Sequence, residues 1–213
     1  MRFWIAAISA LLLSGCVQRR TSATPPTTQL PNPVKVVTVA PAGPGRYDKW
    51  FRDYTLLHFG TLVSPRWAKA VGMAESNLKY NAKSSVGALG LMQFMPATWT
   101  SVAPEPYKSL GAMDPESAIW VGCKYLRWNW ERVPTETVDD RKAFTNAAYN
   151  SGLGWTLKAR QKCRSNPPCD ANLWTNNVEL NLVTNPRAQE ENRRYVVRIR
   201  QFEQQLLLAG EFL

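Results

Sequence analysis

The composition favours acid–base catalysis by a carboxylate over catalysis by a metal ion or a catalytic triad. The chain has one histidine, His58, and four cysteines among 213 residues. A zinc site needs several imidazole or thiolate ligands, and a serine or cysteine nucleophile needs a histidine beside it. His58 lies in an apolar stretch, residues 56–59, which is typical of a packed histidine. We therefore expect no metal site, no cofactor and no catalytic triad.

Glu75 is the carboxylate with the most distinctive sequence around it. A glutamate taken alone is most often an exposed surface residue. Here Glu75-Ser76 is followed, in order, by Gly-Leu-Met-Gln at residues 90–93, Ala-Tyr-Asn-Ser-Gly at residues 148–152 and Glu-Asn-Arg-Arg-Tyr-Val at residues 191–196. A lone Glu-Ser pair is uninformative, whereas four motifs together form a specific pattern.

Helices are predicted to carry these motifs, because apolar residues recur at helical spacing and strand-like alternation is scarce. Ser64-Pro65 is an N-cap followed by a helix-starting proline, which places Glu75 at the C-terminal end of that helix. Asp114-Pro115 starts another helix in the same way. The predicted helical segments are residues 66–74, a short stretch from Pro96, a stretch from Pro115 through Trp130, residues 143–149 and residues 187–208.

The sequence indicates a mainly α-helical domain with few irregular parts. Glycines and serines between residues 79 and 90 interrupt the helical pattern, so that an irregular loop or a very small β-hairpin is expected there. Trp120, Trp128 and Trp130 have helical spacing and are interpreted as core. Trp99 and Trp155 are the better candidates for aromatic side chains that line a cleft.

The N-terminus is predicted to be a secretory signal peptide. Basic Arg2 is followed by an apolar run over residues 3–13, which is too short to span a bilayer as a helix. The run ends in Leu-Ser-Gly-Cys, which resembles the lipobox of bacterial lipoproteins and predicts lipidation of Cys16. Val17 stands where aspartate would retain such a protein in the inner membrane, which favours the outer membrane. The alternative is an ordinary signal peptide with a chance cysteine.

Three parts are expected along the chain. Residues 1–15 form a lipoprotein signal peptide, and residues 16–45 form the lipidated cysteine with a disordered, proline- and threonine-rich tether. Residues 46–213 form the helical domain. This organisation predicts a lipoprotein that is held in the outer membrane and faces the periplasm.

The remaining cysteines fit an oxidising compartment. Cys163 and Cys169 flank a turn-rich loop, and a disulfide between them would suit the periplasm. Cys123 lies on an apolar helix face and is interpreted as a small buried side chain.

The charge indicates an acidic neighbourhood. A formal net charge of +10 would suit nucleic acid, anionic lipid or an acidic wall polymer. No nucleic-acid-binding motif is visible, so we expect no specific nucleic-acid partner.

The four motifs resemble those of the soluble-lytic-transglycosylase type, which is family 1 of the lysozyme-like lytic transglycosylases. The resemblance runs from about Trp67 to Tyr195. It implies a fold similar to goose-type lysozyme and peptidoglycan strands as the partner. It also implies a carbon–oxygen lyase that cleaves the β-1,4 bond between N-acetylmuramic acid and N-acetylglucosamine. Asn192, where the family often has threonine, is a departure from the pattern.

The resemblance assigns roles to particular residues. Glu75 is the single catalytic acid and base, and the Tyr195 hydroxyl hydrogen-bonds to it. Tyr149 and Asn150 shape the floor beneath the muramyl ring. The other expected residues that bind or orient substrate are Ser76, Met92 and Gln93, with Met92 also shielding Glu75 from water.

A second carboxylate, which most glycosidases need, is not supported by the motifs. Asp139 and Asp140 are interpreted as loop residues, and Glu191 as the partner of a nearby arginine. With one acid, the substrate's own acetamido group and 6-hydroxyl would complete the reaction. The product would be a 1,6-anhydromuramyl end, formed without water.

Two alternatives remain open at this point. One is a hydrolytic muramidase, a true lysozyme. The other is a wall-binding component of a secretion machine or a phage particle that uses the domain for local wall penetration. Assembly partners, and a virion instead of the outer membrane, belong to the second alternative.

Overall fold

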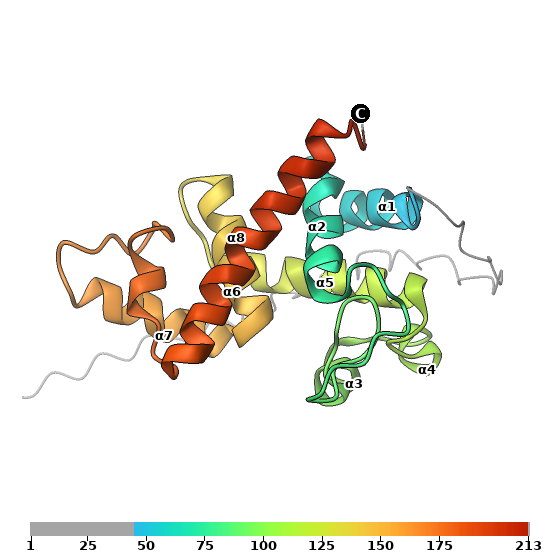
Figure 1. The fold of residues 1–213 in the computed structure, drawn as a ribbon, viewed down its shortest axis with the longest axis horizontal. Coiled ribbons are helices and arrows are strands. Elements are labelled where there is room, and N and C mark those ends of the chain that lie inside the picture. Colours follow the sequence, from blue (N-terminus) through green and yellow to red (C-terminus); the bar gives the residue numbers. More distant parts are fainter. Residues whose placement is uncertain (1–44, 213) are drawn as a thin grey trace, which may run out of the picture. The chain divides into compact units, whose positions relative to one another are not determined.

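A computed structural model describes residues 45–212, and within them the chain is almost entirely helical. The signal peptide, Cys16 and nearly all of the tether lie outside the described residues. The described part contains eight α-helices and one 3₁₀-helix, and Figure 1 labels the α-helices. They are α1 (Asp48–Phe59), α2 (Pro65–Ser76), α3 (Pro96–Val102), α4 (Tyr107–Leu110), α5 (Pro115–Arg132), α6 (Val138–Ser151), α7 (Leu153–Arg164), η1 (Val178–Asn181) and α8 (Pro186–Leu208). The predicted mainly α-helical fold is confirmed.

Side-chain caps fix where the longer helices begin. The Ser64 hydroxyl accepts a hydrogen bond from the Arg66 amide at the start of α2. The Asp114 carboxylate accepts one from the Ser117 amide at the start of α5. Both helices have proline in the first turn, where a missing amide hydrogen costs nothing. These two predicted helix starts are confirmed.

Helix α6 begins earlier than predicted. The Thr137 side chain accepts from the Asp140 amide, so the helix starts at Val138 instead of near Ala143. The interpretation of Asp139 and Asp140 as loop residues is therefore wrong, because both lie in the first helical turn. Their negative charges stabilise the positive end of the helix dipole there.

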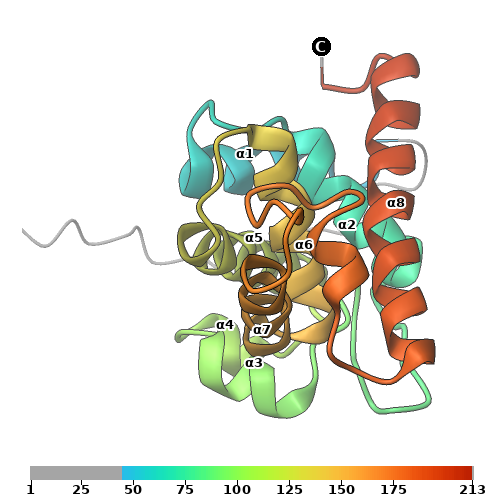
Figure 2. The same ribbon diagram turned by 90° about the vertical axis from the view of Figure 1, so that its left-hand side faces the viewer.

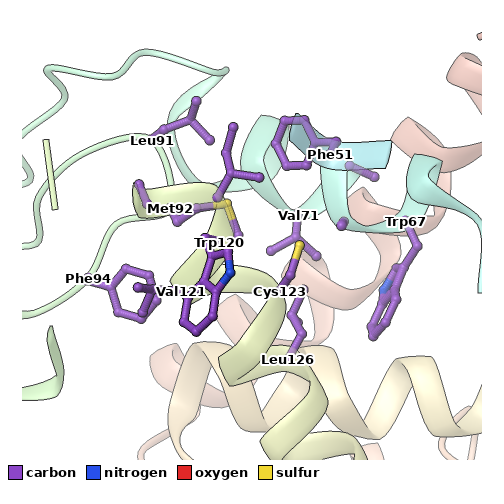
Figure 3. Packing of buried hydrophobic residues seen from close by; sticks show 14 of the residues in the cluster. Phe51, Trp67, Val71, Leu91, Met92, Phe94, Trp120, Val121, Cys123 and Leu126 are labelled. Atoms are coloured by element: carbon purple, nitrogen blue, oxygen red, sulfur yellow. The ribbon is translucent and has the colours of Figure 1, made fainter. Parts of the chain in front are cut away.

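The main core lies where α1, α2 and α5 pack against the segment before α3 (Figure 3). Val71, Cys123 and Leu126 are fully buried in it, as is Met92 from that segment. Gly122 makes room for Met92, since a β-carbon at this position would lie 2.6 Å from the Met92 Cε. The predicted burial of Cys123 is confirmed.

Two tryptophans lie differently from the predictions. Trp128 is 41% exposed, whereas Trp120 and Trp130 are buried. Residues two apart on a helix point to opposite sides, so Trp128 and Trp130 cannot both face one core. Trp99 is 6% exposed and its indole donates to the Lys108 carbonyl, so it is a core residue and not a cleft residue.

A second, smaller core lies between α6, α7 and the segment leading to η1. Phe144 and Trp174 meet there edge to face, with ring centroids 5.3 Å apart. The disulfide between Cys163 and Cys169 closes the loop after α7. None of the helices in the described range is long and apolar enough to cross a membrane.

Helix α8 joins the two cores. It packs along α2 and α6, and it lies beside these helices in both views (Figures 1 and 2). Tyr195 and Ile199 belong to the main core, whereas Val196 belongs to the smaller one. Helix α8 therefore connects α2, which carries Glu75, with α6, which carries the Ala-Tyr-Asn-Ser-Gly motif.

The segment between α2 and α3 is irregular. Isolated β-bridges pair Leu89 with Lys83 and with Phe94. Of the two predicted possibilities, this segment is therefore an irregular loop and not a regular β-hairpin. Gly90 has φ +76°, and a β-carbon there would lie 1.8 Å from the Ala112 carbonyl oxygen. Only glycine fits this backbone approach.

Candidate active site

Glu75 lies in the last turn of α2. The buried face of that helix, which includes Trp67 and Val71, anchors it in the core. The helix ends at Ser76, and the φ of 54° at the next residue, Asn77, turns the chain away. Glu75 is thereby presented at a helix end, half-buried, with its carboxylate accepting a 2.5 Å hydrogen bond from the Tyr195 hydroxyl.

The surroundings of Glu75 favour its protonated form. Burial raises the pKa of Glu75 to about 7, above the ordinary value of 4.5. The Tyr195 hydrogen bond and the Arg198 charge lower this pKa, while the Glu191 charge raises it. The side chain can therefore give up and take back a proton near neutral pH, as a general acid and base must.

Two tyrosines, Tyr195 (buried) and Tyr149 (partly buried), border the carboxylate. Tyr195 comes from α8 and is 2% exposed. Tyr149 comes from α6, and its hydroxyl donates to the Met92 carbonyl oxygen at 2.9 Å. Burial, followed by the Glu75 charge, raises the pKa of both hydroxyls well above the ordinary value. Both tyrosines are therefore neutral neighbours of Glu75.

Three of the expected substrate residues are engaged with the protein itself. The Met92 side chain is fully buried, so the expected substrate contact is wrong for that side chain, and its carbonyl instead holds Tyr149. The Ser76 hydroxyl donates to the Leu91 carbonyl at 2.8 Å. The Gln93 amide donates to the Gly90 carbonyl, also at 2.8 Å. In this geometry Ser76 and Gln93 shape the segment after α2.

Asn192 connects the last motif to the third. Its amide donates to the Ala147 carbonyl and to the Asn150 side-chain oxygen, each at 3.1 Å. Asn192 is buried and Asn150 is exposed. The departure from the family pattern at Asn192 thus provides a fixed partner for Asn150 at the edge of the site.

Glu191 is the site residue that the sequence reasoning misplaced. The arginines nearby pair with Glu190, which accepts from both Arg193 and Arg194. Within residues 45–212 no ion pair involves Glu191. Glu191 lies one helical turn before Tyr195. Its negative charge raises the pKa of Glu75. The i to i+4 spacing of Glu191 and Tyr195 was the sequence signal that could have placed Glu191 near Glu75.

The fold and site together define the class. Helices surround the half-buried Glu75, which is presented at a helix end and held by a tyrosine, with irregular chain on one side. This is a lysozyme-like domain. The crystal structure of the 70 kDa soluble lytic transglycosylase from Escherichia coli matches it with a TM-score of 0.54 and 25% identity, over 79% of this chain and 25% of that one.

The chain belongs to the family of the transglycosylase SLT domain, whose family model matches residues 61–168. The soluble lytic murein transglycosylase of E. coli strain K12 is 34% identical over 116 residues, 52% of this chain. The membrane-bound lytic murein transglycosylase F of Aeromonas hydrophila is 30% identical over 175 residues, 74% of this chain. The matched segments span 17% and 33% of these relatives' lengths.

Proposed function

We propose that this chain is a lytic transglycosylase that cleaves peptidoglycan between N-acetylmuramic acid and N-acetylglucosamine, with Glu75 as acid and base. The observation that carries the proposal is the Glu75 carboxyl, with its pKa raised to about 7 and its orientation held by Tyr195. Family membership supports the same activity.

The chemistry needs one carboxyl group that changes roles. Glu75 donates its proton to the glycosidic oxygen as the bond to the muramyl C1 breaks. The 2-acetamido oxygen of the same sugar bonds to C1 and stabilises the cationic centre. Glu75, now a carboxylate, takes the proton of the 6-hydroxyl, whose oxygen displaces the acetamido group at C1. The acid is restored, and no water is consumed.

Closure by the substrate's own hydroxyl has an entropic advantage. A well-oriented intramolecular group can reach an effective concentration on the order of 10⁵ M or more. Tyr149 and Asn150 are proposed to form the floor that holds the muramyl ring in this orientation. Asn192 fixes the Asn150 side chain, and Met92 fixes the Tyr149 hydroxyl.

The products of wall digestion test this function. We expect released muropeptides to carry 1,6-anhydro ends, because ring closure replaces attack by water. By mass spectrometry they should be lighter by one water than lysozyme products, and borohydride should leave them unchanged. Lysozyme digestion of the same wall preparation is the control.

A hydrolytic muramidase is the second candidate, and Glu191 favours it. A second carboxylate near the acid could position a water molecule, as in two-carboxylate glycosidases. Products with predominantly reducing muramyl ends would establish this reaction and reject the anhydro mechanism. Glu191→Gln should then abolish hydrolysis, whereas a transglycosylase should keep most of its activity.

We also propose that the chain is a lipoprotein of the outer membrane, made of a signal peptide (1–15), a tether (16–45) and the catalytic domain. The support is the Leu-Ser-Gly-Cys sequence at the end of the apolar leader. Relatives named membrane-bound lytic murein transglycosylase F are consistent with an envelope location.

Replacement of the acylated residue tests the anchor. We expect Cys16→Ser to move the protein from the membrane to the soluble fraction, because the chain loses its acyl groups. The acyl mass on the wild-type N-terminal peptide is the direct check. An unmodified Cys16 peptide, with unchanged fractionation of the variant, would reject lipidation.

A further inference from the structure

Two asparagine side chains meet where α8 packs against the end of α6. Asn192 on α8 is 1% exposed, whereas Asn150 in the last turn of α6 is exposed. Asn150 directly follows Tyr149 in the sequence. Asn192 lies about one helical turn before Tyr195, whose hydroxyl binds Glu75. The pair therefore adjoins the two tyrosines that border the candidate catalytic carboxyl.

The partners of Asn192 determine which end of its amide is the nitrogen. One end lies 3.1 Å from the Ala147 carbonyl oxygen and 3.1 Å from the amide of Asn150. A carbonyl oxygen only accepts hydrogen bonds, so this end of Asn192 is Nδ2, which has two hydrogens to donate. One hydrogen goes to each partner, and the donor capacity of Asn192 is fully used.

The orientation of Asn150 follows from that of Asn192. Because the Asn192 Nδ2 donates, the Asn150 atom that it meets is the acceptor, Oδ1. The Asn150 Nδ2 is then held at the other end of the amide, where it donates to no group within residues 45–212. Asn150 therefore presents an N–H donor, and not an oxygen, to its surroundings.

Stability does not explain this arrangement. The Asn192 Oδ1 is buried and has no hydrogen-bond partner in the described part of the chain, and such an acceptor destabilises a fold. The Ala147 carbonyl does not depend on Asn192, because the Ser151 hydroxyl also donates to it, at 2.9 Å. What the arrangement does achieve is a fixed direction for the Asn150 amide.

We propose that Asn192 is a positioning residue, which holds Asn150 with its amide nitrogen outward so that Asn150 binds the glycan as a hydrogen-bond donor. This inference rests on the proposed function. The matching group on the glycan is the carbonyl oxygen of an N-acetyl substituent, which only accepts hydrogen bonds. A de-N-acetylated sugar carries an ammonium group at that place, which only donates. Asn150 therefore favours N-acetylated strands.

Substitutions of Asn150 test the direction of its amide in the full chain. The probe is tetra-N-acetylchitotetraose, titrated calorimetrically. Asn150→Ala removes both ends of the amide, whereas Asn150→Asp keeps an oxygen for Asn192 and removes the N–H donor. Both variants should bind the probe on the order of tenfold more weakly, the effect of one lost hydrogen bond. Neither should weaken binding of the fully de-N-acetylated tetrasaccharide.

Asn185→Asp is the matched control for the added charge. Asn185 is exposed at the start of α8, and its Oδ1 accepts from the Ala188 amide, as an aspartate oxygen also can. We expect this variant to bind the probe like the wild type. If Asn150→Asp binds normally and only Asn150→Ala binds weakly, the oxygen faces the glycan and the proposal is overturned. Normal binding by both would overturn it as well.

Asn192→Leu tests whether Asn192 acts through Asn150. Leucine has a similar size and removes the buried, unpaired Oδ1, so the variant should unfold at a temperature near that of the wild type. Probe binding should weaken by roughly twofold to tenfold, the effect of one side chain that must be ordered on binding.

The same substitution in an Asn150→Ala background should have no effect on binding, because the group that Asn192 positions is gone. An equal loss from Asn192→Leu in both backgrounds would assign Asn192 a purely structural role and overturn the proposal.

The binding measurements separate this inference from the proposed function. If digestion of purified wall releases no products but the variants show the expected binding pattern, the cleavage reaction fails and the positioning role stands. If anhydro products are released and the binding pattern is absent, the inference about Asn192 fails alone.

Discussion

Glu75→Gln is expected to reduce glycan cleavage by roughly 10²–10⁴-fold, the usual contribution of a general acid. An amide cannot deliver a proton to the leaving oxygen, and it cannot take one from the 6-hydroxyl. The side chain keeps its size and can still accept the Tyr195 hydrogen bond, so the thermal unfolding temperature should remain near that of the wild type. Product release from purified wall measures the effect.

The pH dependence identifies the same group. Because the pKa of Glu75 is raised to about 7, the protonated acid is lost as the pH rises through that value. Wild-type activity should fall over this range, and the residual activity of Glu75→Gln should show no such transition. Glu131→Gln, which removes an exposed carboxylate on α5, is the control and should behave as wild type. Activity of Glu75→Gln within a few-fold of wild type would place the acid elsewhere.

The second large effect is expected from Gly90→Ala. A β-carbon would lie 1.8 Å from the Ala112 carbonyl oxygen, and φ is +76°. Unfavourable backbone conformation costs about 1–3 kcal/mol, and forced repacking adds about 1–3 kcal/mol. We therefore expect the free energy of unfolding, measured by denaturant titration, to fall by roughly 2–6 kcal/mol.

Gly87→Ala separates the two causes. Gly87 has a comparable φ of +90°, but no atom lies within 4 Å of the added carbon. Its loss should reflect the backbone conformation alone, about 1–3 kcal/mol. Equal losses in the two variants would mean that the contact with Ala112 relaxes freely. Gly90→Ala should also reduce activity, because Leu91 and Met92 accept the Ser76 and Tyr149 hydrogen bonds.

The parts of the fold that could be predicted are those set by local chemistry. Ser64-Pro65 and Asp114-Pro115 specify helix starts with cap and proline alone, and both helices begin there. The start of α6 depends on Thr137, whose signal is weaker because threonine is common in loops as well. Boundaries of this kind need the surrounding structure.

The parts that could not be predicted depend on contacts between distant segments. Helical spacing alone could not show which of the closely spaced tryptophans faces the core, and Trp128 does not. The motifs indicated Met92 as a site residue, but its contribution is a backbone carbonyl that no side-chain pattern reveals. The effect of Glu191 on Glu75 arises from the docking of α8 against α2.

The hydrogen bond between Glu75 and Tyr195 has a consequence for biosynthesis. Its two partners are 120 residues apart in the sequence. A nascent chain exposes Glu75 long before the ribosome has made Tyr195, and until then the carboxyl lacks both its orienting partner and the cover of α8. The candidate active site is therefore assembled only after α8 has been synthesised and has docked. Truncated or incompletely folded chains should be harmless to the cell that makes them.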